Sequence, residues 1–254
     1  MDDPDVSVFD PLFRDVSGGD IEIRFPRTPE SAPLLRLLGE AFEDRSVDIS
    51  ERSVDGERVV ELVRDGECVA TSPLGDVMDT FLLVNSDLYR TGTSGVDRYE
   101  APAVLTELDE MVFTMRGFPD STKQKLLLIL ISRFIENRAL TAGNGRLDAA
   151  FQQLSRLNDE NGTREVYARL ADSGVDTHIY GVPDAEPLAC ASATRHTGDG
   201  PRYRHTWFVV YSDPDGDRSA ALVAVEFDDN AWRGVWSYRE AFVEETRRIL
   251  DTAF

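Results

Sequence analysis

Residues 121–143 read STKQKLLLILISRFIENRALTAG, and this stretch predicts one long helix around which the rest of the chain packs. Ser121 and Gln124 form a capping box at its start, in which each side chain satisfies a backbone N–H that the helix leaves free. Gly143 follows the last turn, where glycine adopts the left-handed conformation that ends a helix at no steric cost. The sequence therefore marks both ends of this helix.

The first half of the helix carries six consecutive apolar residues, Leu126–Ile131. A run of that length covers every face of a helix, so we expect it to be held from more than one side. Lys123, Lys125 and Arg133 bracket the run, which is too short to span a membrane. A core helix is the first interpretation. The alternative is a surface shared with a partner subunit, for which the candidate interface residues are Leu127, Leu128 and Ile131.

The second half of the helix is charged, and further polar residues follow it on the next predicted strand. Arginine suits planar or anionic groups because the guanidinium fork binds them in bidentate fashion. We therefore predict either an internal Arg–Glu network or a ligand pocket at the helix end with an aromatic wall. The candidate ligand-binding residues are Arg133, Glu136, Arg138, Arg146, Gln152 and Trp236.

Hydrophobic periodicity and turn residues divide the rest of the chain into short elements. The Asp-Gly pairs at 55–56 and 65–66 favour tight hairpins. Strands are predicted at 21–25, 47–53, 58–63, 67–71, 146–153, 176–182, 205–212, 220–227 and 232–238. Further helices are predicted at 34–42, 72–82, 163–171 and 238–250.

This order of elements predicts an α+β fold with mostly antiparallel sheets, helices packed on one side of them and one long central helix. It also predicts four segments along the chain. These are a flexible N-terminal arm at 1–20, an αβ unit at 21–85, a connector at 86–119 and a second α+β domain at 120–254.

The composition is strongly acidic, with a formal net charge of −20 and only two lysines, Lys123 and Lys125. Such a surface stays hydrated in multimolar salt, where screening removes the self-repulsion that destabilises it in dilute buffer. We expect a halophilic archaeon as the source. The charge argues against nucleic-acid binding, because that function needs cations along the phosphates. The N-terminus lacks an apolar segment, so we expect a cytoplasmic protein without membrane insertion.

No catalytic signature occurs in the sequence: there is no G-x-S-x-G elbow, P-loop or dinucleotide fingerprint. The histidines are His178, His196 and His205, and no carboxylate or cysteine stands at metal-ligand spacing from them. Cys68 and Cys190 are too far apart in sequence to suggest a metal or redox pair. We therefore expect no catalytic residue, metal or cofactor, and do not expect an enzyme.

Five segments of the second half resemble one known family. They are IENRALTAGNGRLDAAFQQLS (135–155), VYARLADSGVDTHIYGVP (166–183), HTWFVVYS (205–212), AALVAVE (220–226) and RGVWSYREAFV (233–243). In this order they resemble the DICT sensory domain, and more closely its stand-alone haloarchaeal type. The resemblance implies an α+β domain on a four-stranded sheet at 120–254 and a sensory role beside diguanylate-cyclase, phosphodiesterase and two-component modules. A link to light responses has been proposed for the family. The resemblance supplies no catalytic residues.

The sequence thus predicts a regulatory protein of signal transduction that binds a small ligand or a partner protein without catalysis. No kinase, cyclase or DNA-binding segment is visible in it, so we expect its output to run through a signalling partner. The alternative is a structural or interaction protein that uses the long helix as an oligomerisation or docking surface, with a homo-oligomer as its product.

Overall fold

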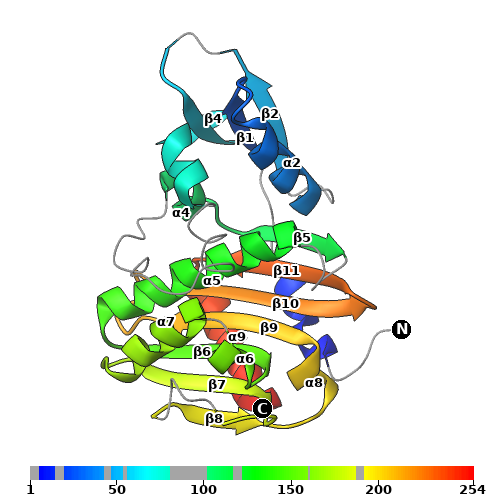
Figure 1. Ribbon diagram of the computed structural model, residues 1–254, viewed down its shortest axis with the longest axis vertical. Coiled ribbons are helices and arrows are strands. Elements are labelled where there is room, and N and C mark those ends of the chain that lie inside the picture. Colours follow the sequence, from blue (N-terminus) through cyan, green and yellow to red (C-terminus); the bar gives the residue numbers. More distant parts are fainter. Residues whose placement is uncertain are drawn as a thin grey trace.

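The computed structural model describes residues 6–14, 20–42, 47–53, 56–80, 102–116, 122–159, 161–186 and 192–254. Its strands form two mixed sheets, one of four strands and one of seven, and Figure 1 shows the smaller sheet above the larger one. Of the predicted turn at 55–56, only residue 56 is described. The helix predicted at 72–82 is described as far as residue 80, and residues 74–80 of it are helical.

The smaller sheet has the strand order β2-β1-β3-β4, with β1 parallel to β2 and the other pairs antiparallel. Its strands are β1 (Ile21–Pro26), β2 (Asp48–Arg52), β3 (Val59–Arg64) and β4 (Glu67–Pro73). Asp65 and Gly66 have φ angles of 51° and 83°, so the predicted tight hairpin between β3 and β4 is confirmed. Helix α2 (Ala32–Ala41) contacts β2.

The larger sheet has the order β5-β11-β10-β9-β6-β7-β8. Strands β6, β7 and β8 are parallel to one another, and the remaining pairs are antiparallel. The strands are β5 (Met111–Arg116), β6 (Arg146–Gln153), β7 (Asp176–Val182), β8 (Thr194–Thr197), β9 (Thr206–Ser212), β10 (Ala220–Asp228) and β11 (Ala231–Ser237).

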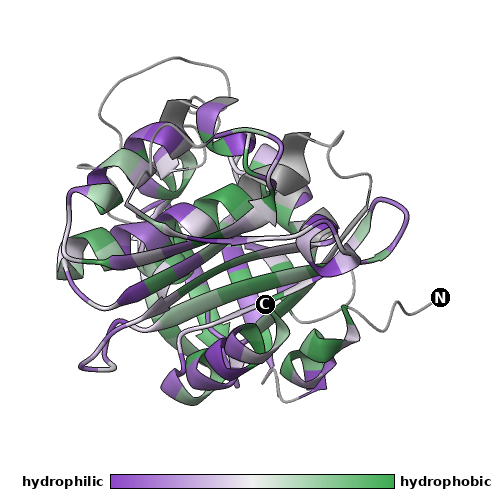
Figure 2. Cartoon of the chain, turned by 90° about the horizontal axis from the view of Figure 1, so that it is seen from below, coloured by the Kyte–Doolittle hydropathy of each residue, from purple (hydrophilic) through white to green (hydrophobic). Residues whose placement is uncertain are grey.

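Helices cover both faces of the larger sheet, as Figure 2 shows. On one face lie α5 (Thr122–Ala142), α6 (Arg156–Asp159) and α7 (Asn161–Ala171). On the other lie η1 (Ser7–Phe9), α1 (Asp10–Arg14) and α9 (Glu240–Ala253). The shorter helices α4 (Ala103–Thr106) and α8 (Pro201–Arg204) pack at the periphery.

The predicted fold class is wrong in its architecture. The sheets are mixed because a helical crossover returns the chain parallel: α6 and α7 join β6 to β7 in the larger sheet, and α2 joins β1 to β2 in the smaller one. The helices lie on two sides, and α5 belongs to one of these layers rather than forming a single central helix. The fold is α+β with two mixed sheets of four and seven strands.

The two-sided covering follows from the apolar strands of the larger sheet. In β9, Val209 and Tyr211 pack in the hydrophobic cluster that contains α5, whereas Phe208 and Val210 pack in the cluster that contains α9. Both faces of β10 are buried in the same way from Ala220 to Val225. A strand that is apolar on both faces needs cover on both.

The division of the chain into four segments stays a prediction. Within the predicted connector, Met111–Arg116 forms β5 and pairs with β11 in the larger sheet. Within the predicted arm, Phe9 is fully buried, with its ring centroid 6.4 Å from that of Phe208. The larger sheet has seven strands, whereas the family resemblance implies a sheet of four at 120–254.

Candidate functional site

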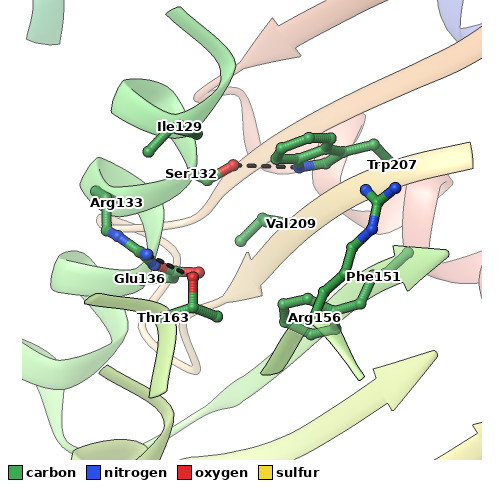
Figure 3. Close-up of a pocket in the computed structure, with 10 residues that line it drawn as sticks. Ile129, Ser132, Arg133, Glu136, Phe151, Arg156, Thr163, Trp207 and Val209 are labelled. Carbon is green, nitrogen blue, oxygen red and sulfur yellow. Dashed lines mark hydrogen bonds and ion pairs between the residues drawn. The ribbon is translucent and has the colours of Figure 1, made fainter. Parts of the chain in front are cut away.

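A small, partly open cavity of about 50 Å³ lies between α5, α7 and the larger sheet (Figure 3). Its wall combines charged, hydroxyl and apolar side chains from five elements. The lining residues are Ile129, Ser132, Arg133, Glu136, Ala150, Phe151, Arg156, Thr163, Trp207 and Val209. By volume the cavity holds roughly three to five water molecules. It can therefore enclose a small chemical group, and a larger ligand would extend through its open side.

Helix α5 supplies one polar wall through residues spaced three and four apart, which share one face of a helix. The Arg133 Nη1 atom lies 2.5 Å from Glu136 Oε2, and its Nη2 donates to Thr163 Oγ1 at 2.7 Å. The side chains of Arg133 and Glu136 are only 11% and 3% exposed. Removing one partner of such a buried pair is costly, so this wall is rigid.

Strand β9 supplies the facing wall. Trp207 and Val209 alternate along the strand and therefore point to the face that α5 covers. The Trp207 indole Nε1 donates to Ser132 Oγ at 3.3 Å, which fixes the indole across the cavity from the helix. Trp207 is thus an aromatic side chain in the wall of this cavity, whereas Trp236, the aromatic candidate from the sequence, does not line it.

A strained bulge in β6 forms the floor. The β6–β7 pairing runs from Ala150 opposite Tyr180 directly to Gln153 opposite Val182, so two residues oppose Gly181. Gln152 has a φ angle of 61°, a conformation that costs about 1–3 kcal/mol in a non-glycine residue. Strain of this kind gathers at functional sites.

The two residues of the bulge differ in where their side chains lie. Phe151 lines the cavity, whereas Gln152 is 6% exposed and does not line it. The Phe151 ring meets Tyr167 of α7 edge-on, with centroids 5.0 Å apart. Just beyond, Arg156 at the start of α6 extends toward Trp207 (Figure 3).

The predicted ligand-binding residues divide among several places. Arg133 and Glu136 line the cavity. Arg138 packs against the rings of Phe134 and Tyr238, which meet edge-on with their centroids 5.5 Å apart. Trp236 is fully buried and donates to the Leu108 carbonyl at 2.6 Å, so it belongs to the core. Helical spacing on α5 identifies Ser132 as a further wall residue, while Arg156 and Thr163 carried no signal in the sequence.

Arg146 lies on the opposite face of the sheet. It binds the fully buried Asp148 through Nε at 3.0 Å and Nη2 at 2.7 Å, and Asp148 also accepts a bond from the Tyr180 hydroxyl at 2.7 Å. Burial and the Asp148 carboxylate together raise the pKa of Tyr180 far above its ordinary value. This cluster is an internal network, but it joins Arg146 to Asp148 and Tyr180 and contains no glutamate of α5.

The candidate interface residues Leu128 and Ile131 are each 1% exposed and pack inside the chain's own core. The side chain of Leu127 lies outside the described residues. The described parts of the chain contain no group of three or more His, Cys, Asp or Glu side chains placed to hold a metal ion. No helix in those parts is long and apolar enough to cross a membrane.

Comparison with known proteins agrees with the sequence resemblance. Residues 102–226 match the family DICT, described as the sensory domain in diguanylate cyclases and two-component system. The match supports the DICT family for this chain, and with it a sensory role in signal transduction. All residues that line the cavity fall within the matched segment.

No curated protein matches the chain. One similar solved structure is the polyphosphate kinase from Porphyromonas gingivalis, with 10% sequence identity and a TM-score of 0.32 over 98% of this chain. The chain spans 48% of the length of that protein. A likeness at this level carries no argument about fold or function.

Proposed function

We propose that the chain is a sensory module that binds a small ligand in the cavity between α5, α7 and β9 without converting it chemically. The observation that carries this proposal is the position of the cavity, which lies wholly within the segment matched to the DICT sensory domain. A rigid ion pair, a fixed indole and a strained bulge surround it, and such preorganised walls favour binding because little order is lost when a ligand enters.

The character of the lining supports binding without turnover. Its described residues include no histidine, cysteine or lysine. The Glu136 carboxylate is held by Arg133, so a strong base beside a nucleophile is not assembled there. Ligand occupancy is then passed to a signalling partner protein, in keeping with the occurrence of the DICT domain in diguanylate cyclases and two-component system.

The proposal includes the source organism and the cellular location of the protein. The net charge of −20 and the near-absence of lysine favour a halophilic archaeon, a cytoplasmic location and the stand-alone haloarchaeal type of DICT protein. An assembly role for α5 has less support, since the described apolar residues of its first half are occupied within the chain.

Thermal melts of the full chain with a panel of four small probes test the ligand site. Acetate, acetamide, inorganic phosphate and uracil differ in charge and planarity, and a bound probe raises the midpoint by mass action. At least one should stabilise the wild type and be recovered unchanged. The pocket-filling Ile129→Phe should abolish that response, whereas Val69→Phe, at an exposed site on β4, should keep it. A panel without effect, or an equal effect on Ile129→Phe, would overturn the proposal.

A further inference from the structure

The charges on the cavity wall differ in sign from the chain as a whole. Two guanidinium groups, those of Arg133 and Arg156, and one carboxylate, that of Glu136, line the cavity. The formal charge of the lining is therefore +1, in a chain whose net charge is −20. Charges act strongly in a half-buried site because little water screens them. The lining favours a ligand that carries negative charge.

The two arginines have different roles. Arg133 is fixed by Glu136 and Thr163, and a ligand that broke this buried pair would leave a charge uncompensated. Arg133 therefore keeps its position in the cavity wall when a ligand binds. Arg156 is half-buried on the other side, and its guanidinium extends across the cavity toward Trp207 (Figure 3). Its planar fork matches the oxygen atoms of a carboxylate or a phosphate.

Ser132 provides an independent indication of an acceptor in the ligand. This residue is 5% exposed, and its Oγ accepts the hydrogen bond from the Trp207 indole. Within the described residues, that hydroxyl makes no hydrogen bond as a donor. A buried O–H without an acceptor is unfavourable, so an oxygen of a bound group or a water completes it. The O–H and the Arg156 guanidinium border the same cavity.

The volume limits what can enter. A space for roughly three to five waters accommodates a carboxylate or phosphate group, and the ligand body lies outside it. We infer that the cavity binds the carboxylate or phosphate group of a small anion, held by the Arg156 guanidinium and the Ser132 hydroxyl against Trp207. This inference rests on the proposed function and names the ligand class of the same site.

Binding titrations at fixed ionic strength, followed by tryptophan fluorescence or calorimetry, test the inference. Acetate and acetamide have nearly the same shape and differ in charge, so acetate should bind at least tenfold more tightly. Inorganic phosphate forms the second arm, and the tighter of the two anions identifies the group as a carboxylate or a phosphate. Equal binding of acetate and acetamide, with no binding of phosphate, would overturn the inference.

Substitutions assign the contacts. Arg156→Gln should weaken anion binding at least tenfold, and Arg156→Lys less, because it keeps the charge but loses the fork. Ser132→Ala should weaken it about three- to tenfold, the worth of one hydrogen bond. Arg164→Gln, an exposed position next to Thr163 on α7, removes the same charge outside the cavity and should stay within twofold. Unchanged binding in both Arg156 variants would contradict the assignment.

The outcomes separate this inference from the proposed function. Suppose that uracil or acetamide stabilises the wild type, that the anions do not, and that Ile129→Phe abolishes the effect. The ligand is then not an anion, but the cavity is still a ligand-binding site. If no probe of the panel binds, both the site and its ligand class are refuted.

Discussion

The His196 imidazole lies flat against the ring of Tyr180, with the ring centroids 4.2 Å apart and the planes 7° from parallel. His196 Nε2 is also 2.9 Å from His178 Nδ1, and His178 Nε2 is 3.2 Å from Asp176 Oδ2. These contacts connect β8, the outermost strand of the larger sheet, to β7. With both histidines neutral, each ring can donate one hydrogen bond along this chain: His178 Nε2 donates to Asp176, and His196 Nε2 donates to His178 Nδ1.

Acid should therefore weaken the attachment of β8. Burial and the neighbouring His178 lower the pKa of His196 from 6.5, although Asp148 and Asp251 act in the opposite sense and Arg146 adds to the lowering. Because the folded state disfavours the protonated form, the stability contributed by neutral His196 is complete above pH 6.5 and is lost as the pH falls below it. Melts between about pH 7.5 and 5.5 should show a smaller acid-induced drop for His196→Asn than for the wild type.

His205→Asn is the matched control for this measurement. His205 is half-exposed and contacts Glu226 on β10, so it takes no part in the attachment of β8. This variant should therefore keep the acid sensitivity of the wild type. If His205→Asn loses it and His196→Asn does not, the pH response arises at the β9–β10 pair and not at β8.

The sequence predicted the elements more successfully than their arrangement. The capped segment 121–143 corresponds to α5, and the alternation in Ile21–Phe25 corresponds to β1, because these signals are local. The parallel crossover from β6 through α7 to β7 depends on strands that meet far apart in sequence. One available signal was missed: the continuous apolar run in β10 indicates a strand covered on both faces.

In the candidate site, too, the sequence predicted local relationships between residues but not contacts between distant segments. Arg133 and Glu136 share a helix face, so their common location followed from spacing. Arg146 was grouped with them by its nearness in the sequence, yet it lies across the sheet because strand residues of even and odd position point to opposite faces. Arg156 lines the cavity four residues after the bulge at Gln152, and no local pattern in the sequence predicts that bulge.

Arg138→Ala should lower stability without affecting the cavity. The Arg138 Cζ atom lies 4.6 Å from the ring centroid of Phe134 and 4.7 Å from that of Tyr238, and Nη1 donates to the Ser219 carbonyl at 3.3 Å. Loss of these contacts should cost about 1–3 kcal/mol. Each kcal/mol lowers the melting midpoint by about 2–4 °C in a chain of this size. An unchanged melt together with lost probe binding would place Arg138 in the ligand site instead.

Leu128→Asp should unfold the chain or cost several kcal/mol, since it places a carboxylate where the side chain is 1% exposed. Val69→Asp introduces the same charge at a position that is 47% exposed, and it should change stability by no more than about 0.5 kcal/mol. Thermal melts and size-exclusion chromatography measure both effects. A folded Leu128→Asp with normal stability and a smaller assembly would show that this position is an interface.

Removing salt should destabilise the fold. With a net charge of −20, repulsion between carboxylates extends over about 10 Å in 0.1 M salt and about 3 Å in 1 M salt. The melting midpoint in about 0.1 M KCl should therefore lie below that in molar KCl. Equal midpoints would mean that the acidic surface does not limit stability in dilute buffer.

Asp148 should be the most sensitive charged position on the α9 side of the sheet. Its side chain is fully buried, and it is the common acceptor for Arg146 and for the Tyr180 hydroxyl. Asp148→Asn would keep the shape but leave the Arg146 charge without its buried counter-ion, which should cost about 3–5 kcal/mol. Tyr180→Phe removes one hydrogen bond and should cost about 0.5–1.5 kcal/mol.

Asp251→Asn is the internal control for this cluster. Asp251 also pairs with Arg146, at 3.2 Å, but its side chain is 53% exposed, so solvent screens the pair. Its neutralisation should cost no more than about 1 kcal/mol. Chemical denaturation of the three variants measures the order directly. If Asp251→Asn destabilised the fold as much as Asp148→Asn, the charge of Arg146 would be balanced at the surface, and the buried network would contribute packing instead of charge compensation.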